Sequence, residues 1–172
     1  MKIKKASEMI MSTELVNMKR VMRRLDMIDK NDVPLLKGKV SAGISASDEI
    51  LTTELIFSGF FQELDPIQMA AVLSCLVFND TKSEGKPPKD EKLSVPFIAL
   101  QETIKRVATI MEESGMEIKK DEFLLKFAPE MMETTYAWCK GAKFNEICEI
   151  SETPIFEGTI IRCLRRLDEL IS

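Results

Sequence analysis

Apolar residues recur three or four positions apart along most of this chain, which is the period of amphipathic α-helices. The first such segment runs from residue 3 to about residue 28, with Lys19, Arg20, Arg23 and Arg24 among its apolar positions. The same period predicts further helices at 47–59, 66–78, 95–114, 119–126, 129–140, 143–150 and 156–171. The pattern therefore predicts an all-α fold, a helical bundle of about seven to eight helices.

Capping residues mark where two of these helices begin. Ser47 is the predicted N-cap of one helix, because acidic residues follow it in the first turn. Asp65 is the predicted N-cap of the next, with Pro66 at its first helical position. The segment 66–78 is apolar on nearly all sides, so we expect it to be the central buried helix.

Two stretches interrupt the helical period. Residues 31–46 hold a proline and two glycines between short apolar pieces, which predicts extended connectors at 33–36 and 40–44. Residues 79–92 are polar and include two consecutive prolines, which is typical of a flexible internal loop. We therefore expect the whole chain, 1–172, to form a single domain.

Charge and cysteine content limit the classes of partner and compartment. The net charge of −4 argues against binding nucleic acid through bulk electrostatics, so any RNA or DNA contact must come from a local patch. No apolar run reaches the roughly 18 residues of a transmembrane helix, so we expect no membrane partner. The four cysteines lie at scattered spacings without a CxxC pair. We expect them to be reduced core residues, which indicates the cytosol or the nucleus.

Several kinds of catalytic chemistry are absent from the sequence. The chain contains no histidine, so it has no His-based triad, no imidazole acid–base step and no histidine–metal site. The Gly-Lys pairs at 38–39 and 85–86 do not lie in a phosphate-binding loop, and GxGxxG and GxSxG do not occur. We therefore expect a chain that is not an enzyme by itself and that binds no metal or other cofactor.

The final segment, FEGTIIRCLRRLDELIS, raises the main functional question. On a helix turning about 100° per residue, its apolar residues cover one half of the circumference and Arg162, Arg165, Arg166 and Glu169 gather on the other. Arg165 and Glu169 are spaced to form a surface ion pair. Arg162 and Arg166 project the same way with no acid between them. This arginine face (Arg162, Arg165, Arg166 and Glu169) is either simply solvated or a guanidinium row that contacts phosphates or splayed bases.

The three C-terminal helices have the pattern of a helix-turn-helix. Gly141 makes the first break and a polar SETP connector makes the second, so this trihelical unit would present the polar face of the last helix to a nucleic acid. Tyr136 and Trp138 lie in an apolar helical pattern, and we expect both to be mainly core residues. Units of three helices are also common in protein cores without any nucleic-acid contact. The C-terminal helices are therefore either a nucleic-acid-binding helix-turn-helix or simply part of the packing of the domain.

Two long stretches resemble the C-terminal DSHCT domain of exosome-associated DExH-box RNA helicases. They are LKGKVSAGISASDEILTTELIFSGFFQELDPIQMAAVLSCLVF and EMMETTYAWCKGAKFNEICEISETPIFEGTIIRCLRRLDEL. The shared features are GKV before the DEILTTE helix, the AVLSCLVF helix, the YAWCKGAKFNEI turn and the final FEGTIIR helix. The resemblance covers about residues 17–170, nearly the whole chain.

The resemblance implies a function within a larger motor. The family domain packs against two RecA-like ATPase domains and closes a ring through which single-stranded RNA is drawn in the 3′–5′ direction for processing or decay by the exosome. A long "ratchet" helix of the domain faces the RNA, and by motif it corresponds to the segment holding Arg162, Arg166 and Glu169. ATP and Mg²⁺ would be bound by the RecA-like domains, which this sequence lacks.

The resemblance also implies partners and a compartment. The ending FEGTIIRCLRRL is more similar to the nuclear helicase of the TRAMP polyadenylation complex than to its cytoplasmic Ski-complex relative. We therefore expect exosome or TRAMP-like partners and a nuclear location, with the cytoplasm as the alternative. The family continues past Leu170 with further helices, so we expect an apolar groove beside the last helix. Two other functions stay open, a helix-turn-helix DNA-binding module and a pure protein-docking scaffold.

Overall fold

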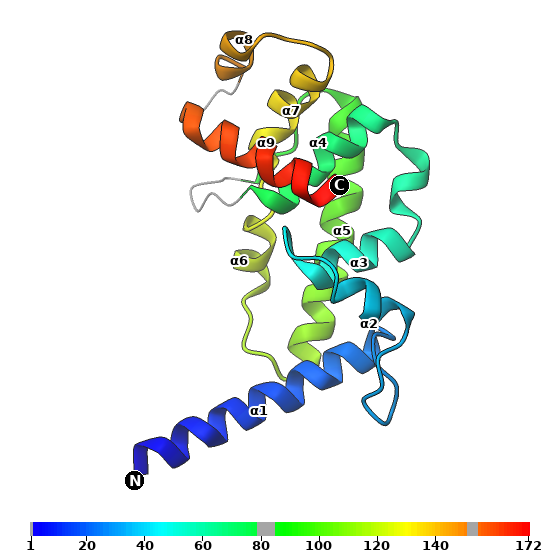
Figure 1. The fold of residues 1–172 in the computed structure, drawn as a ribbon, viewed down its shortest axis with the longest axis vertical. Helices are drawn as coiled ribbons and strands as arrows, with labels where there is room; N and C mark the ends of the chain where they lie inside the picture. The colour runs from blue at the N-terminus through cyan, green and yellow to red at the C-terminus, as the bar shows by residue number, and fades with distance from the viewer. Residues whose placement is uncertain (1, 79–84, 151–154) are drawn as a thin grey trace.

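The computed structural model describes residues 2–78, 85–150 and 155–172, and these residues form an all-α fold (Figure 1). Its α-helices are α1 (Lys2–Arg24), α2 (Leu36–Ser41), α3 (Glu49–Phe57), α4 (Pro66–Val77), α5 (Glu91–Glu113), α6 (Lys120–Leu125), α7 (Met132–Cys139), α8 (Phe144–Cys148) and α9 (Glu157–Ile171). Short 3₁₀ turns occupy Phe60–Glu63 and Pro129–Met131. An isolated antiparallel bridge joins Ile28 and Pro34, and no strand occurs in the described ranges. The predicted all-α fold is confirmed.

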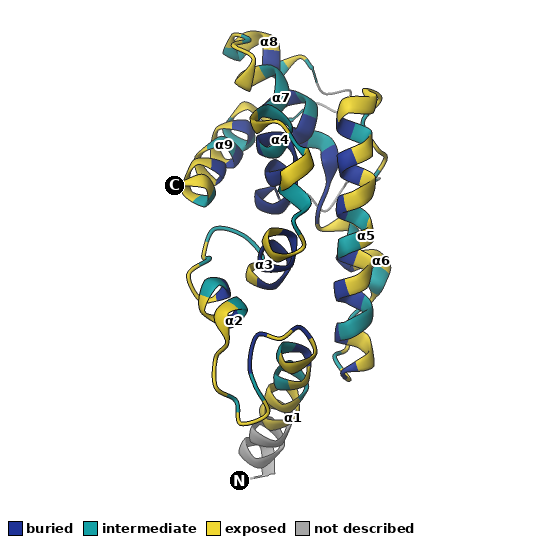
Figure 2. Cartoon of the chain, turned by 90° about the vertical axis from the view of Figure 1, so that its right-hand side faces the viewer, coloured by how far each residue is buried: buried dark blue, intermediate teal, exposed yellow. Residues whose placement is uncertain are grey.

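Helix α4 is the centre of the core, as predicted. Every residue from Ala70 to Val77 is buried, and α4 packs against α5, α7 and α9 (Figure 2). The predicted cap is also confirmed. Asp65 Oδ1 accepts hydrogen bonds from the backbone amides of Ile67 and Gln68 at 2.8 and 2.9 Å, and Pro66 opens the first turn.

Helix α1 ends earlier than predicted, at Arg24 instead of about residue 28. Asp26 adopts a left-handed conformation with φ of 56°, which turns the chain away from the helix axis. The buried side chains of Leu25 and Met27 then anchor this turn in the core. The apolar positions that suggested a longer helix are therefore explained by a buried turn.

The segment after this turn corrects the predicted extended connectors, because Leu36–Ser41 forms helix α2. Leu35 donates its backbone amide to Met27 O at 2.9 Å, which lays the start of α2 on the preceding turn. Gly38 permits the approach, since a Cβ at this position would lie 2.2 Å from Met27 O. Contact with the turn just before it thus accounts for a helix that the local apolar pattern does not indicate.

Helix α3 is capped by Asp48, which corrects the predicted cap at Ser47. Asp48 Oδ1 accepts from the backbone amide of Leu51 at 2.8 Å, while the Ser47 hydroxyl pairs with Thr52 Oγ1 at 2.8 Å. Further along α3, the buried Glu54 carboxylate accepts from Lys37 Nζ of α2 at 2.7 Å and Arg106 Nη2 of α5 at 3.0 Å. These two bonds tie α3 to both α2 and α5, and they fix the two ends of the segment that joins α2 and α3.

Helix α5 begins four residues earlier than predicted, at Glu91, because the Asp90 side chain caps it by accepting from the amide of Lys92 at 3.0 Å. The predicted flexible loop 79–92 is therefore too long at its C-terminal end, where Glu91 and Lys92 are helical. Residues 79–84 of that loop lie outside the described residues, as does the SETP connector at 151–154.

The three C-terminal helices are present, with α8 shorter than predicted. Helix α7 packs against α8, and α9 lies across α4 (Figure 1). The face of α9 that packs on α4 is thus fixed by the central core, and the opposite face is open to the surroundings.

Candidate nucleic-acid interface

The last helix, α9, separates an apolar face from a charged face, as its sequence predicted. Ile160, Cys163 and Leu167 are buried on the side of α4, and the Cys163 thiol contacts Ser74 O of α4 at 3.9 Å. Burial raises the pKa of Cys163 to about 12, so the thiol is neutral in the core. All four members of the arginine face (Arg162, Arg165, Arg166 and Glu169) are exposed.

The three arginines of this face carry no ion pair within the described part of the chain. The predicted pair between Arg165 and Glu169 does not form, so that prediction is wrong. Arg162 donates from Nη2 to the Thr159 hydroxyl at 2.8 Å, which is a neutral partner. Guanidinium groups with no carboxylate opposite them are available to an external anion.

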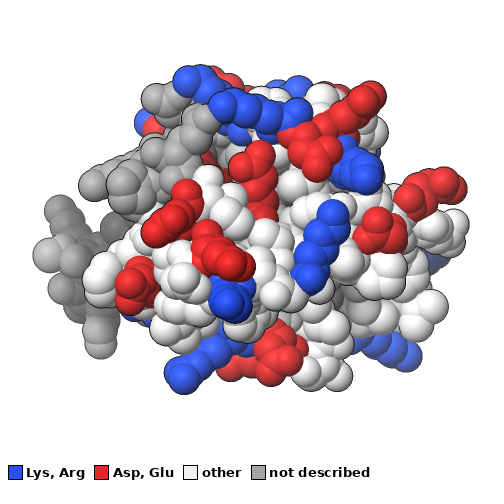
Figure 3. All heavy atoms as spheres, turned by 90° about the horizontal axis from the view of Figure 1, so that it is seen from above, with Lys and Arg blue, Asp and Glu red and all other residues white. Residues whose placement is uncertain are grey.

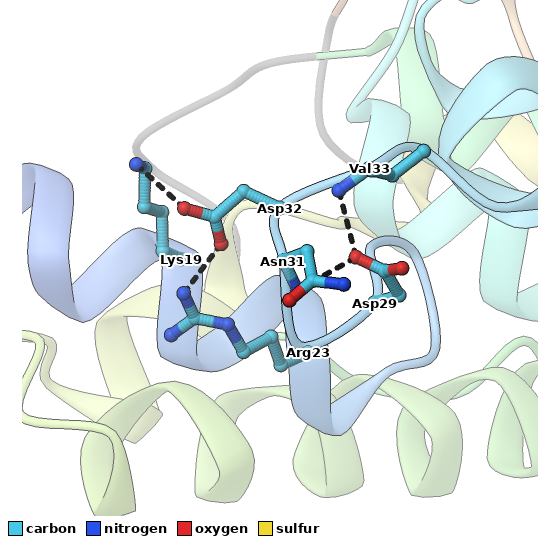
Figure 4. Close-up of polar contacts among 6 residues, drawn as sticks. All are labelled: Lys19, Arg23, Asp29, Asn31, Asp32 and Val33. Atoms are coloured by element: carbon cyan, nitrogen blue, oxygen red, sulfur yellow. Dashed lines mark hydrogen bonds and ion pairs between the residues drawn. The ribbon is translucent and has the colours of Figure 1, made fainter.

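Of the four basic residues named on α1, Lys19, Arg23 and Arg24 pair with carboxylates, whereas Arg20 donates to the neutral Asn17 Oδ1 at 3.2 Å. Lys19 Nζ contacts Asp32 Oδ2 at 2.9 Å, and Arg23 contacts the other oxygen of the same carboxylate (Figure 4). Arg24 pairs with Glu113 at the end of α5. The hydrogen bond from Lys19 and the charge of Arg23 lower the pKa of Asp32, so this carboxylate stays ionised beside its two partners. Lys19 and Arg23 thus hold the turn after α1 and Arg24 contacts α5, so these three cations are not free to bind an external anion.

Arg166 and Glu169 also line a cleft of about 480 Å³ that three other parts of the fold complete. The segment between α2 and α3 reaches the C-terminal half of α9 in both ribbon views (Figures 1 and 2). The lining residues are Ser45, Ala46, Ser47, Asp48, Leu76, Val77, Lys126, Phe127, Arg166 and Glu169. Arg162 and Arg165 are not among them, so the structure divides the arginine face into two cleft residues and two that lie outside it.

Asp48 and Lys126 are the charged cleft residues that the sequence did not suggest. Burial raises the pKa of Asp48, while its hydrogen bond from Leu51 and the charge of Lys126 act in the opposite direction. The Lys126 ammonium also lies over the Phe123 ring, 5.5 Å from its centroid. Along the sequence Asp48 is one of the two acidic residues that follow Ser47, and Lys126 belongs to no motif. Their proximity to α9 exists only in the tertiary fold.

The expectation that Trp138 is a core residue is wrong, since its side chain is 42% exposed at the end of α7. Tyr136 is half-buried, with Lys140 Nζ 4.3 Å from its ring centroid. Cys139 is exposed too, although Cys75 and Cys163 are buried as expected. Neither aromatic residue lines the cleft.

For the residues that the structure describes, the surface charge, the possible metal ligands and the length of the helices indicate no further binding site. Viewed from the end that carries α8, basic and acidic side chains are interspersed (Figure 3), so this face is not uniformly basic. Among the described residues, no group of three or more acidic or cysteine side chains is placed to hold a metal ion. Nor does any helix in these ranges have the length and apolarity needed to cross a membrane.

The family match and similar curated proteins agree on one family for this chain. Residues 31–172 match the model of the DSHCT (NUC185) domain. The chain is 43% identical over 170 residues to the ATP-dependent RNA helicase mtr4 of Schizosaccharomyces pombe, covering 99% of this chain and 15% of that protein. It is 43% identical over 169 residues to the human Exosome RNA helicase MTR4, covering 98% and 16%. It is also 38% identical over 170 residues to the DExH-box ATP-dependent RNA helicase DExH9 of Arabidopsis thaliana, covering 99% and 17%. The chain thus spans about one sixth of the length of these relatives.

Proposed function

The chain belongs to the DSHCT domain family, and on that premise we propose that it is a non-catalytic domain of an ATP-dependent 3′–5′ RNA helicase. In this proposal the arginine face of α9 contacts single-stranded RNA in the helicase channel and supports unwinding. ATP and Mg²⁺ are bound by RecA-like domains of the same helicase, which lie outside this sequence. The domain itself therefore contributes binding groups and no chemical step.

One observation carries the proposal, which is that no ion pair among the described residues involves the three arginines of α9. Three of the other four arginines, Arg23, Arg24 and Arg106, have carboxylate partners. Arg162 and Arg166 lie one helical turn apart on an exposed face, at a spacing that places two cations side by side. Phosphate groups, which accept the planar fork of a guanidinium, are the ligands that relieve this repulsion.

The names of the relatives suggest the biological setting. The human protein is called an exosome RNA helicase, so we propose the exosome, or a TRAMP-like complex, as a partner of the longer protein. We therefore also propose a nuclear location for the longer protein, as its similarity to the exosome helicases suggests. Glu169 lies on the same face of α9 and lines the cleft with Arg166, where its carboxylate is available to accept a hydrogen bond from a base amino group.

Fluorescence anisotropy of the 172-residue chain with single-stranded RNA, duplex RNA and duplex DNA tests this function. We expect weak, salt-sensitive binding that favours single-stranded RNA. Arg162→Ala combined with Arg166→Ala should weaken it about tenfold or more and reduce the slope of log K against log salt by about 1.4, or about 0.7 per lost phosphate contact. Arg20→Ala combined with Lys105→Ala removes the same charge from α1 and α5 and serves as the matched control.

The alternatives give different results in the same titration. Preference for duplex DNA would favour a helix-turn-helix module. Equal losses in the double variant and its control would mean that general charge, and not α9, attracts the RNA. Absence of binding to every nucleic acid would contradict the proposed RNA contact and leave a protein-docking scaffold.

A further inference from the structure

We propose that the cleft beside α9 holds one ribonucleotide of a single-stranded RNA and recognises its 2′-hydroxyl group. This inference rests on the proposed RNA contact of α9 and goes further, because it assigns a chemical selectivity to residues outside that helix. They are Asp48 at the start of α3 and Lys126 at the end of α6.

The size and lining of the cleft suit a nucleotide. Its volume of about 480 Å³ lies within the range of small-molecule sites, about 300–1,000 Å³. Leu76, Val77 and Phe127 line the cleft but are almost fully buried, so its exposed lining is mostly the hydroxyl and charged groups of the other residues. This lining matches the hydroxyl groups and the phosphate of a nucleotide more than its base.

Two cations of the cleft come from different elements and can hold one phosphate between them. Arg166 is fixed on α9, and Lys126 follows the short helix α6. Neither has an ion-pair partner among the described residues, although Asp48 and Glu169 line the same cleft. The fold thus places four charged groups around one space, and no direct ion pair among the described residues joins them.

The two carboxylates decide which ligand fits this space. A bare phosphate or sulfate would be repelled by Asp48 and Glu169, whereas a hydroxyl group donates a hydrogen bond to an ionised carboxylate. The 2′-hydroxyl of ribose is such a donor, and it is the group that distinguishes RNA from DNA. Asp48 is well suited to this role because its Oδ1 bond to the amide of Leu51, at 2.8 Å, holds the carboxylate rigidly in the cleft wall.

The experiment compares 12-nucleotide oligouridylate with oligodeoxyuridylate of the same length, which differ only at the 2′ position. Anisotropy is measured with the wild-type chain and with Asp48→Asn, Glu169→Gln and Lys126→Gln, and Lys105→Gln is the control for loss of one exposed cation. Asparagine is as good an N-cap as aspartate, so Asp48→Asn should leave α3 folded, and circular dichroism with thermal melting verifies this for each variant.

We expect the wild-type chain to bind the ribo-oligomer about fivefold more tightly than the deoxy-oligomer, since one hydrogen bond of ordinary strength distinguishes them. Asp48→Asn or Glu169→Gln should reduce this ratio towards one. Lys126→Gln should weaken both oligomers more than Lys105→Gln does, without changing the ratio.

Two results would overturn the inference while leaving the proposed function intact. One is equal wild-type affinity for both oligomers together with dependence on Arg166. The other is a preference for RNA that neither carboxylate variant changes. If neither oligomer binds up to millimolar concentration, or if Arg162→Ala/Arg166→Ala has no effect, the RNA contact itself is contradicted and the inference is lost with it.

Discussion

The side-chain amide of Gln68 donates a hydrogen bond from Nε2 to the backbone oxygen of Lys92 at 2.8 Å. Lys92 lies four residues before Pro96, and proline lacks the amide that would otherwise bond this oxygen inside α5. The same side chain accepts from the backbone amide of Asp65 through Oε1 at 3.0 Å, which completes the capping box of α4. Gln68 therefore caps one helix and supplies the donor missing from its neighbour.

Gln68→Ala should lower the free energy of unfolding by about 1–2 kcal/mol, because two hydrogen bonds that satisfy helix ends are lost together. Urea denaturation followed by circular dichroism measures this change. Gln62→Ala, in the 3₁₀ turn before α4, removes an exposed glutamine and should change stability by less than about 0.5 kcal/mol. Equal effects of the two substitutions would contradict the dual role of Gln68.

A double-mutant cycle with Pro96→Ala separates the two bonds of Gln68. Pro96→Ala restores a backbone amide that can bond Lys92 O within α5, so the bond from Gln68 becomes redundant. We expect Gln68→Ala to cost about 1 kcal/mol less in this background than in the wild type. Strict additivity of the two substitutions would show that the bond between Gln68 and Lys92 contributes nothing.

Gly38→Ala should destabilise the domain by about 1–3 kcal/mol, because the added Cβ would lie 2.2 Å from Met27 O and the backbone must move. Gly43→Ala is the matched control, since the nearest atom to its added Cβ, Val40 O, lies 3.4 Å away. Thermal melting of both variants tests the close approach of α2 to the turn after α1. A loss no larger for Gly38→Ala than for Gly43→Ala would be inconsistent with that packing.

Asp48→Asn should stabilise the domain at neutral pH and lose this advantage in acid. Burial raises the pKa of Asp48 above its ordinary value of 3.8, so the native chain holds this proton more tightly than the unfolded chain does. The favourable contribution of the protonated carboxyl is therefore present below the unfolded pKa and is lost as pH rises through the native pKa.

The measurement is the difference in unfolding free energy between Asp48→Asn and wild type at about pH 3 and about pH 7. We expect this difference to favour the variant more strongly at the higher pH. A difference that does not change with pH would mean that Asp48 ionises equally well in the native and unfolded states. Asp48→Asn is thus expected to stabilise the fold at neutral pH while it lowers the preference for RNA over DNA.

Much of the fold follows from local pattern. The burial of α4 was predictable because its residues are apolar on nearly all sides, and the cap at Asp65 was predictable because it precedes Pro66. The errors fall where the structure depends on contacts between elements or on the surface of the fold. Helix α2 depends on the backbone contact between Gly38 and Met27, and the exposure of Trp138 depends on α7 ending at the surface.

The period of apolar residues by itself determined that the chain is helical and which segment is central. It also determined that one face of the last helix carries Arg162, Arg165, Arg166 and Glu169. These properties depend only on neighbours along the chain. The tertiary structure decided which cations remain available. It pairs Lys19 and Arg23 with Asp32, whereas the arginines of α9 have no carboxylate partner in the described ranges. It also brings Asp48 and Lys126 to Arg166 and Glu169 around one cleft. Such proximity arises only when three separate elements pack on a common core, and no spacing in the sequence encodes it.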